Sequence, residues 1–230
     1  MAYIGSKPAS KPVVASDLDP TIITGQTAIG ATPADTDELI ISDAGVLKRM
    51  DYSHIKASSA LTKISTSTVS NVSSLTLDVF TSTYRNYRII GSGITPATDS
   101  TNFNLELFQA DDTEASNYYW GGAANYDNQS DGGVETLRGG TAENEIRIFD
   151  DADNSGDESE VNFDMMVYQP QIAADTTIGC FSTGRKNAVR GGTHIFGGFG
   201  GSTSVMTKVK FSFASGNIAN GVFTVYGLEN

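Results

Sequence analysis

The stretch that decides the fold is VMTKVKFSFASGNIANGVFTVYGLEN, residues 205–230. In Val205–Phe213, apolar or β-branched residues alternate with polar ones, which is the two-residue period of a strand with one buried face. Small polar residues and glycines follow at 215–221, where a positive φ is tolerated and the chain can reverse. A β-branched and aromatic run, Val222–Tyr226, completes the pattern. This closing strand pair predicts an all-β domain before it.

Upstream of this stretch, the chain is almost continuously β-like from about Leu75 onward. The alternation is clearest in 103–107 and 161–167. Short strands joined by long glycine-rich connections predict an antiparallel β-sandwich, similar to a jelly roll, over residues 71–230. The expected strands are Leu75–Phe80, Tyr84–Ile90, Phe103–Phe108, Glu143–Phe149, Val161–Tyr168, Thr176–Phe181, His194–Phe199, Val205–Phe213 and Val222–Tyr226.

The front of the chain has a different composition. Four of the six prolines lie in the first 33 residues, between small polar residues, which predicts an extended arm over residues 1–36. DELIISDAGVLKRM, residues 37–50, is typical of a strand, a tight turn and a second strand. A short helical turn capped by Asp51 is expected next. A hairpin and linker over residues 37–70 would be marginal in water alone, so another surface is needed to cover it.

The composition limits the function classes. The net charge is −12, and residues 99–164 hold 17 acidic and 2 basic side chains, a field that repels phosphate backbones and argues against nucleic acid as a partner. No segment approaches the roughly 18 apolar residues of a membrane span, and the first residues lack the layout of a signal peptide. Cys180 is the only cysteine, so no internal disulfide forms, and we expect this thiol to be buried in a chain made in a reducing cytosol.

The acidic stretch DDADNSGDE, residues 150–158, has oxygen ligands in the order of the first half of a calcium loop. The twelfth position is Asn162 instead of a bidentate glutamate, and both flanks are strand-like. Two interpretations therefore remain, a solvated hairpin loop or a Ca²⁺ site, and no other cofactor is expected. The ligands of such a site would be Asp151, Asp153, Ser155 and Asp157.

An aromatic cluster at 117–126 could form a flat face on which sugars stack, or it could belong to the core or a subunit interface. The candidate receptor-binding residues are Tyr118, Tyr119, Trp120 and Tyr126. The glycine-rich stretch 191–201 lacks the GK[ST] of a phosphate loop and is interpreted as a flexible loop or a tight subunit contact. No nucleophile elbow or H-E-x-x-H motif is present, and no carboxylate pair stands out for glycan hydrolysis, so we expect no catalytic residues and no enzyme.

Three stretches resemble the small virion proteins and fibre domains of tailed bacteriophages. FTSTYRNYRIIGSGITPATD, residues 80–99, is similar to the strand and turn of those proteins, and KFSFASGNI, residues 210–218, with YGL at 226–228, resembles their closing strands. ITGQTAIGATPADTDELIISDAGVLKRMDYSHIK, residues 23–56, is similar to tail-fibre segments in which a short hairpin follows a linker. These structural motifs cover about half of the chain.

The resemblance implies a structural protein of the virion, made in the host cytoplasm, and most directly a tail fibre or adhesin subunit. Residues 1–36 would dock on other virion proteins, and the sandwich would bind a host-surface glycan or protein. The resemblance also implies a homotrimer, unless the hairpin packs on its own sandwich. The open alternatives are a capsid decoration or cement protein, a head fibre, a glycan-degrading tail enzyme and a cellular lectin-like module. The hairpin residues expected to assemble the trimer are Leu39, Ile41, Val46 and Leu47.

Overall fold

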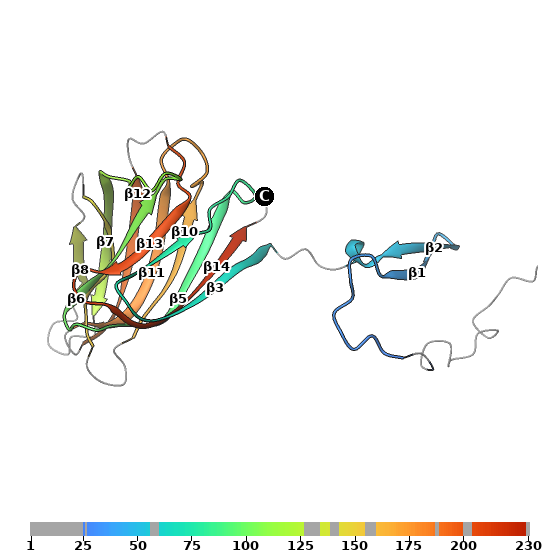
Figure 1. The fold of residues 1–230 in the computed structure, drawn as a ribbon, viewed down its shortest axis with the longest axis horizontal. Coiled ribbons are helices and arrows are strands. Elements are labelled where there is room, and N and C mark those ends of the chain that lie inside the picture. The colour runs from blue at the N-terminus through green and yellow to red at the C-terminus, as the bar shows by residue number, and fades with distance from the viewer. Residues whose placement is uncertain are drawn as a thin grey trace, which may run out of the picture. The chain divides into compact units, whose positions relative to one another are not determined.

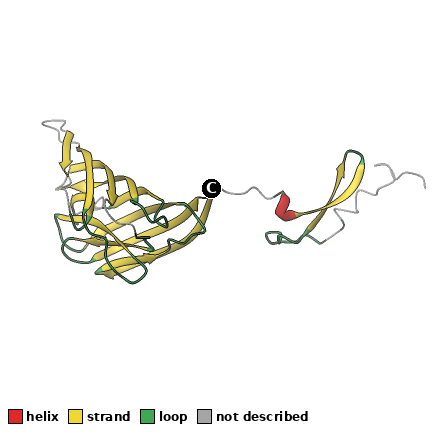
Figure 2. Cartoon of the chain, turned by 90° about the horizontal axis from the view of Figure 1, so that it is seen from above, coloured by secondary structure: helices red, strands yellow, loops and turns green. Residues whose placement is uncertain are grey.

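The structure, a computed structural model, divides the chain into two units, Met1–Ser58 and Ser59–Asn230. Strands form nearly all of the regular structure in both units (Figures 1 and 2), which confirms the predicted all-β class. The described residues are 25, 27–55, 60–126, 134–138, 143–154, 160–186, 189–199 and 204–228.

The first unit is the predicted hairpin, formed by β1 (Glu38–Asp43) and β2 (Val46–Asp51). Its two-residue turn has Ala44 at φ 49° and Gly45 at φ 83°, the left-handed pair that suits the twist of antiparallel strands. A 3-10 helix, Tyr52–His54, follows as expected. The predicted cap was wrong, because the Asp51 side chain makes no capping hydrogen bond.

The predicted assembly residues of the hairpin are largely open to solvent. Leu39 and Val46 are exposed and Ile41 is half-buried. Leu39 pairs with Met50, Ile41 with Lys48, and Val46 with Asp43, so these three predicted residues share one face of the ribbon. The fourth, Leu47, pairs with Ser42, and its side chain lies outside the described part of the chain.

The twelve antiparallel strands described in the second unit form one continuous network that divides into two sheets at a single residue pair. The eight-stranded sheet has the order β3-β14-β5-β10-β11-β12-β7-β8, the four-stranded sheet has the order β4-β13-β6-β9, and a single residue pair between β11 and β9 joins them. The strands of this unit are β3 (Leu61–Val72), β4 (Ser74–Asp78), β5 (Asn86–Pro96), β6 (Thr101–Phe108), β7 (Tyr118–Tyr126), β8 (Val134–Arg138), β9 (Ile146–Ala152), β10 (Val161–Tyr168), β11 (Thr177–Lys186), β12 (Val189–Phe199), β13 (Lys208–Phe213) and β14 (Ile218–Leu228).

The pairing order identifies the sandwich as a jelly roll. Strand β3 pairs with β14, β4 with β13, β5 with β10 and β6 with β9, so the chain forms nested antiparallel pairs. Eight strands paired in this way, and divided into two four-stranded sheets, form the jelly-roll topology. Two further hairpins extend it. The pair β11–β12 follows β10, the pair β7–β8 precedes β9, and all four strands lengthen the sheet that contains β5 and β10 (Figure 1).

Phenylalanine rings fill the space between the two sheets. The ring of Phe211 on β13 lies 5.4 Å from that of Phe163 on β10 and 5.2 Å from that of Phe223 on β14, measured between centroids. Phe103 on β6 joins the same cluster. All four side chains are buried, as the alternation in the sequence predicts.

Three sequence expectations differ from the structure. Residues 61–70, assigned to the linker of the hairpin region, belong to the edge strand β3, whose polar threonines and serines conceal a strand paired along its length with β14. Strands β7 and β8 were not among the expected strands. The glycine-rich stretch 191–201 was interpreted as a flexible loop or a tight subunit contact outside its expected strand His194–Phe199, but β12 already includes its first three residues, and a Cβ on Gly197 would lie only 3.0 Å from Ile146 Cδ1.

Candidate functional site

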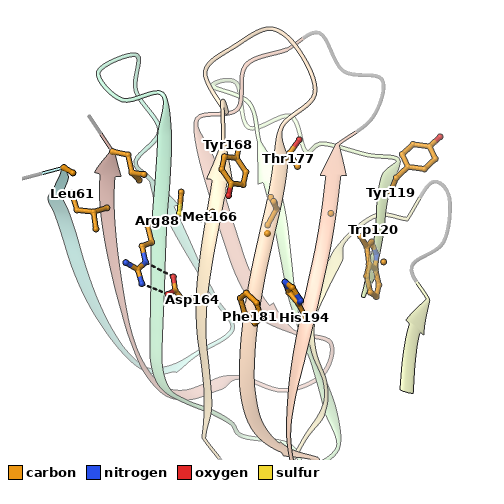
Figure 3. A pocket seen from close by; sticks show the side chains of 16 residues that line it. Leu61, Arg88, Tyr119, Trp120, Asp164, Met166, Tyr168, Thr177, Phe181 and His194 are labelled. Carbon is orange, nitrogen blue, oxygen red and sulfur yellow. Dashed lines mark hydrogen bonds and ion pairs between the residues drawn. The ribbon is translucent and has the colours of Figure 1, made fainter. Parts of the chain in front are cut away.

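A groove of about 1150 Å³ lies on the face of the eight-stranded sheet that points away from the phenylalanine cluster. Alternation along β10 creates this face, because Phe163, Met165 and Val167 are buried in the core and the residues between them point outward. The residues around the groove, drawn in Figure 3, come from seven strands and from Ala60 just before β3. The residues that line it are Ala60, Leu61, Arg88, Tyr119, Trp120, Gly121, Asp164, Met166, Tyr168, Thr177, Ile178, Gly179, Phe181, His194, Gly197 and Leu228.

Two glycines form the floor of the groove. Gly179 on β11 and Gly121 on β7 both have an outward register position, and a Cβ built on either would meet nothing within 4 Å. Neither has a positive φ, so the backbone does not require glycine at these positions. The groove therefore lies over two outward positions, on β11 and β7, that carry no side chain; in the register row, the position of Phe196 on β12 lies between them.

Aromatic rings surround this floor. Phe181 on β11 is 61% exposed and stacks on His194 of β12, with ring centroids 3.8 Å apart and an interplanar angle of 17°. Tyr168 on β10 and Tyr119 on β7 are also exposed and lie in one cross-strand row. Three strand spacings of roughly 4.8 Å separate these tyrosines, so their Cα atoms are about 14 Å apart. Rings exposed to water at these intervals can stack on apolar faces of a ligand.

One ion pair forms the polar side of the groove. Arg88 on β5 donates from Nε to Asp164 Oδ1 at 2.8 Å and from a terminal nitrogen to Oδ2 at 2.5 Å (Figure 3). This bidentate hydrogen bond, together with the charge of Asp164, raises the pKa of Arg88. Both side chains remain partly exposed, so each keeps donor or acceptor capacity for a ligand.

The structure divides the predicted receptor-binding residues. Tyr119 lines the groove from the outer face. Trp120 borders the groove, but its register opposite Gly197 places its half-buried side chain on the same face as Tyr118, against the core. Tyr118 does not line the groove, because it is fully buried and its hydroxyl accepts a hydrogen bond from the Leu107 amide at 2.7 Å. This burial raises the pKa of Tyr118. The side chain of Tyr126 lies outside the described residues.

We expect Tyr118→Phe to lower the free energy of unfolding by about 1–3 kcal/mol, because the Leu107 amide would lose a buried acceptor. Ligand binding in the groove should not change, since the hydroxyl points into the core. Chemical denaturation and a binding titration on the same preparation measure both quantities. If Tyr118→Phe lost affinity for the ligand but kept its stability, Tyr118 would belong to the binding face after all.

The predicted calcium ligands are only partly described. Asp153 is buried beside Arg185, at 3.3 Å, and Asp151 lies 3.7 Å from Lys186, while Ser155 and Asp157 lie outside the described residues. Within the part of the chain that the structure describes, no group of three or more potential metal ligands converges. A cation would have to compete with the two basic side chains. Thermal melting with and without millimolar calcium tests this site. An unchanged melting temperature would exclude a calcium site in this loop.

A second polar cluster lies on the outer side of the four-stranded sheet. Glu106 on β6 pairs with Lys210 on β13 at 2.5 Å, and Glu145 accepts a hydrogen bond from Asn104 at 2.8 Å. Burial, followed by the charge of Glu106, raises the pKa of Glu145. Burial and a hydrogen bond with Glu106 raise the pKa of Glu114 in the same way. This cluster therefore favours protonated carboxyl groups in the folded state.

We expect Glu145→Gln to increase the free energy of unfolding at pH 7. A carboxyl group with a raised pKa in the folded chain stabilises the fold at low pH, and this contribution is lost as the pH rises through that pKa. Glutamine does not ionise and can still accept the hydrogen bond from Asn104. The difference in the free energy of unfolding between the variant and the wild type should vanish when the pH falls below the ordinary glutamate pKa of about 4.3. Urea unfolding at pH 7 and at about pH 3.5 tests this, and lower stability of the variant at pH 7 would contradict it.

Sequence reasoning missed most residues of the groove as site residues, among them Arg88, Asp164, Phe181 and His194. These four come from four strands, and only the register brings them side by side, for example Phe181 opposite both Asp164 and His194. Their common signal was an outward position in an alternating strand. Cys180, one residue before Phe181, points the other way and is buried as expected, and this burial raises the pKa of its thiol.

Comparisons of the chain with protein families, with characterised proteins and with solved structures find no match. No helix among the described residues has the length and apolar character that crossing a membrane requires.

Proposed function

We propose that this protein is a structural component of a tailed-bacteriophage virion, a tail fibre or adhesin subunit whose sandwich binds a glycan on the host surface. The observation that supports this function is the groove with its glycine floor, exposed aromatic rings and ion pair. Pyranose rings present apolar C–H faces and hydroxyl edges. The apolar C–H faces can stack on Phe181, Tyr119 and Tyr168. The hydroxyl edges can hydrogen-bond to Arg88 and Asp164.

The exposure of the aromatic rings argues for a binding role. Large aromatic side chains are normally placed where most of their surface leaves water, yet Phe181 is 61% exposed. Exposed apolar groups gathered in one place on a soluble domain mark a binding site. A ligand that covers Phe181 would gain the burial that the free domain lacks.

The hairpin supports the assembly part of the proposal. In the proposed homotrimer, residues 1–36 attach to other virion proteins, and the face that carries Leu39, Ile41 and Val46 packs against its copies. This face offers exposed apolar side chains on a two-stranded ribbon too small to be stable alone. Threefold packing would bury them.

We expect Val46→Asp to convert the trimer into a monomer, because three carboxylates would be brought together in an apolar interface. The control is Ile40→Asp, which places the same charge on the opposite face of the ribbon, where Ile40 pairs with Arg49. Light scattering should give about three times 24.3 kDa for the wild-type chain and the control. A molecular mass of one chain for the wild-type protein would contradict the proposed trimer.

Two experiments test the proposed function. An array of bacterial surface polysaccharides should retain the wild-type chain, and Phe181→Ala should lose this binding while its melting temperature is kept. Immunogold labelling of intact particles should mark the tail. Labelling of the head would favour a capsid decoration protein, and an array without any bound polysaccharide would contradict glycan binding.

A further inference from the structure

We infer that the groove selects an uncharged oligosaccharide, longer than one sugar ring, over acidic glycans and single sugars. This inference rests on the proposed function and defines its ligand class. Three features of the described residues support it: the charge balance of the groove, the distance between its aromatic rings and the hollow between them.

The charge balance argues against an anionic ligand. Among the described residues that line the groove, Arg88 and Asp164 are the only acidic or basic side chains apart from His194, and they already neutralise each other through two hydrogen bonds. A sialic or uronic acid carboxylate that approached Arg88 would also approach Asp164. The whole chain carries a net charge of −12, so the long-range field repels anions as well. A neutral sugar avoids both penalties and can hydrogen-bond to the pair.

The spacing of the rings argues for a ligand of several sugar units. Tyr168 and Tyr119 lie about 14 Å apart across the sheet, with Thr177 and Gly198 between them in the row. Phe181 lies four residues along the chain from Thr177, which is again about 14 Å at the rise of a strand. A single pyranose covers one of these rings at a time. An extended chain of sugars contacts two or three.

The shape of the groove favours a saccharide over a protein partner. Its volume of about 1150 Å³ is slightly above the range of roughly 300–1,000 Å³ that small-molecule sites occupy. The rings stand apart around the hollow above Gly179 and Gly121, whereas a stable protein interface needs a large continuous surface of roughly 800 Å² on each side. A narrow ligand can lie on the floor and reach the rings on either side.

The test uses the full chain and matched ligands. Calorimetry would compare neutral hexose oligosaccharides of one to six units with oligosaccharides of the same lengths that contain uronic acid. We expect affinity to rise with length in the neutral series and to be roughly tenfold or more weaker for each acidic counterpart. Equal affinity for one unit and six, or preference for the acidic series, would overturn the inference while glycan binding itself stood.

A charge variant makes the test sharper. Asp164→Asn removes the carboxylate but leaves Arg88, so it should gain roughly tenfold affinity for the acidic series. Asp78→Asn makes the same charge change on the exposed side of β4 in the other sheet and should gain nothing. Equal gains in both variants would assign the effect to net charge and overturn the role of the pair. If the chain bound neither series, the proposed function would be overturned as well. If Phe181→Ala changed the molecular mass of the protein in solution, this face would instead be a contact between copies of the chain.

Discussion

Replacing Phe211 by alanine is expected to lower the free energy of unfolding of the sandwich by about 3–5 kcal/mol, the usual cost of removing a buried phenylalanine side chain. Phe211 is fully buried and its ring touches the rings of Phe163 and Phe223 on the opposite sheet. The variant would therefore leave a cavity at the place where the two sheets meet. This loss is a large share of the 5–15 kcal/mol that holds a typical domain together.

The control is Phe181→Ala, the same substitution on the outer face of the eight-stranded sheet. Phe181 is 61% exposed, so its loss should change the free energy of unfolding by no more than about 0.5 kcal/mol. Urea unfolding followed by circular dichroism measures both variants. We expect Phe211→Ala to lower the stability and Phe181→Ala to lower only the affinity for the ligand. Equal stability losses would mean that the outer face is covered in the folded protein.

The second large effect is expected for Gly179→Val, which should weaken glycan binding by roughly a hundredfold while stability is kept or increased. A Cβ at this position meets nothing within 4 Å, so the isopropyl group would occupy the hollow of the groove. The same group displaces the ligand from the floor. Valine also favours a strand more than glycine does, and the backbone at Gly179 has no positive φ to oppose it.

The matched control for Gly179→Val is Thr183→Val, on the same strand and the same outward side but not among the residues of the groove. Both variants introduce the same side chain on β11, so only the position differs. Binding calorimetry and thermal melting should show lost affinity for Gly179→Val alone, with neither variant less stable than wild type. Full affinity in Gly179→Val would mean that the ligand does not lie on this floor.

The sequence predicted most of the sandwich because its core strands follow the simplest rule. Alternation in 103–107 and 161–167 located β6 and β10 and identified their buried residues. Strand β3 escaped because its serines and threonines show no apolar face, and β7 because glycines and alanines occupy its middle. Both strands depend on pairing with a neighbour, β14 or β12, which no local pattern reveals.

The candidate site was predictable only where its residues are neighbours in the chain. Tyr119 and Trp120 were found because aromatic residues cluster at 117–126, but this cluster alone did not reveal which of them point inward. Tyr118 and Trp120 face the core and Tyr119 between them faces outward, because successive residues of a strand face opposite ways. Arg88 and Phe181 come from strands separated by 93 positions in the numbering, and only the register of the extended sheet brings them to one groove.

The two additional hairpins form one side of the groove. Gly179, Phe181 and His194 lie on β11 and β12, and Tyr119 lies on β7. The eight-stranded jelly roll contributes the opposite side through Arg88 and the residues of β10. The groove therefore spans the junction between the basic fold and its extension, and a jelly roll without these four strands would lack it.

The most direct measurement compares the binding of a neutral oligosaccharide to the full chain and to Gly179→Val by calorimetry. The wild-type chain should bind the oligosaccharide in a saturable titration, and Gly179→Val, whose added side chain would occupy the hollow of the groove, should bind it far more weakly. A ligand that binds Gly179→Val as tightly as wild type would contradict the placement of the binding site in this groove.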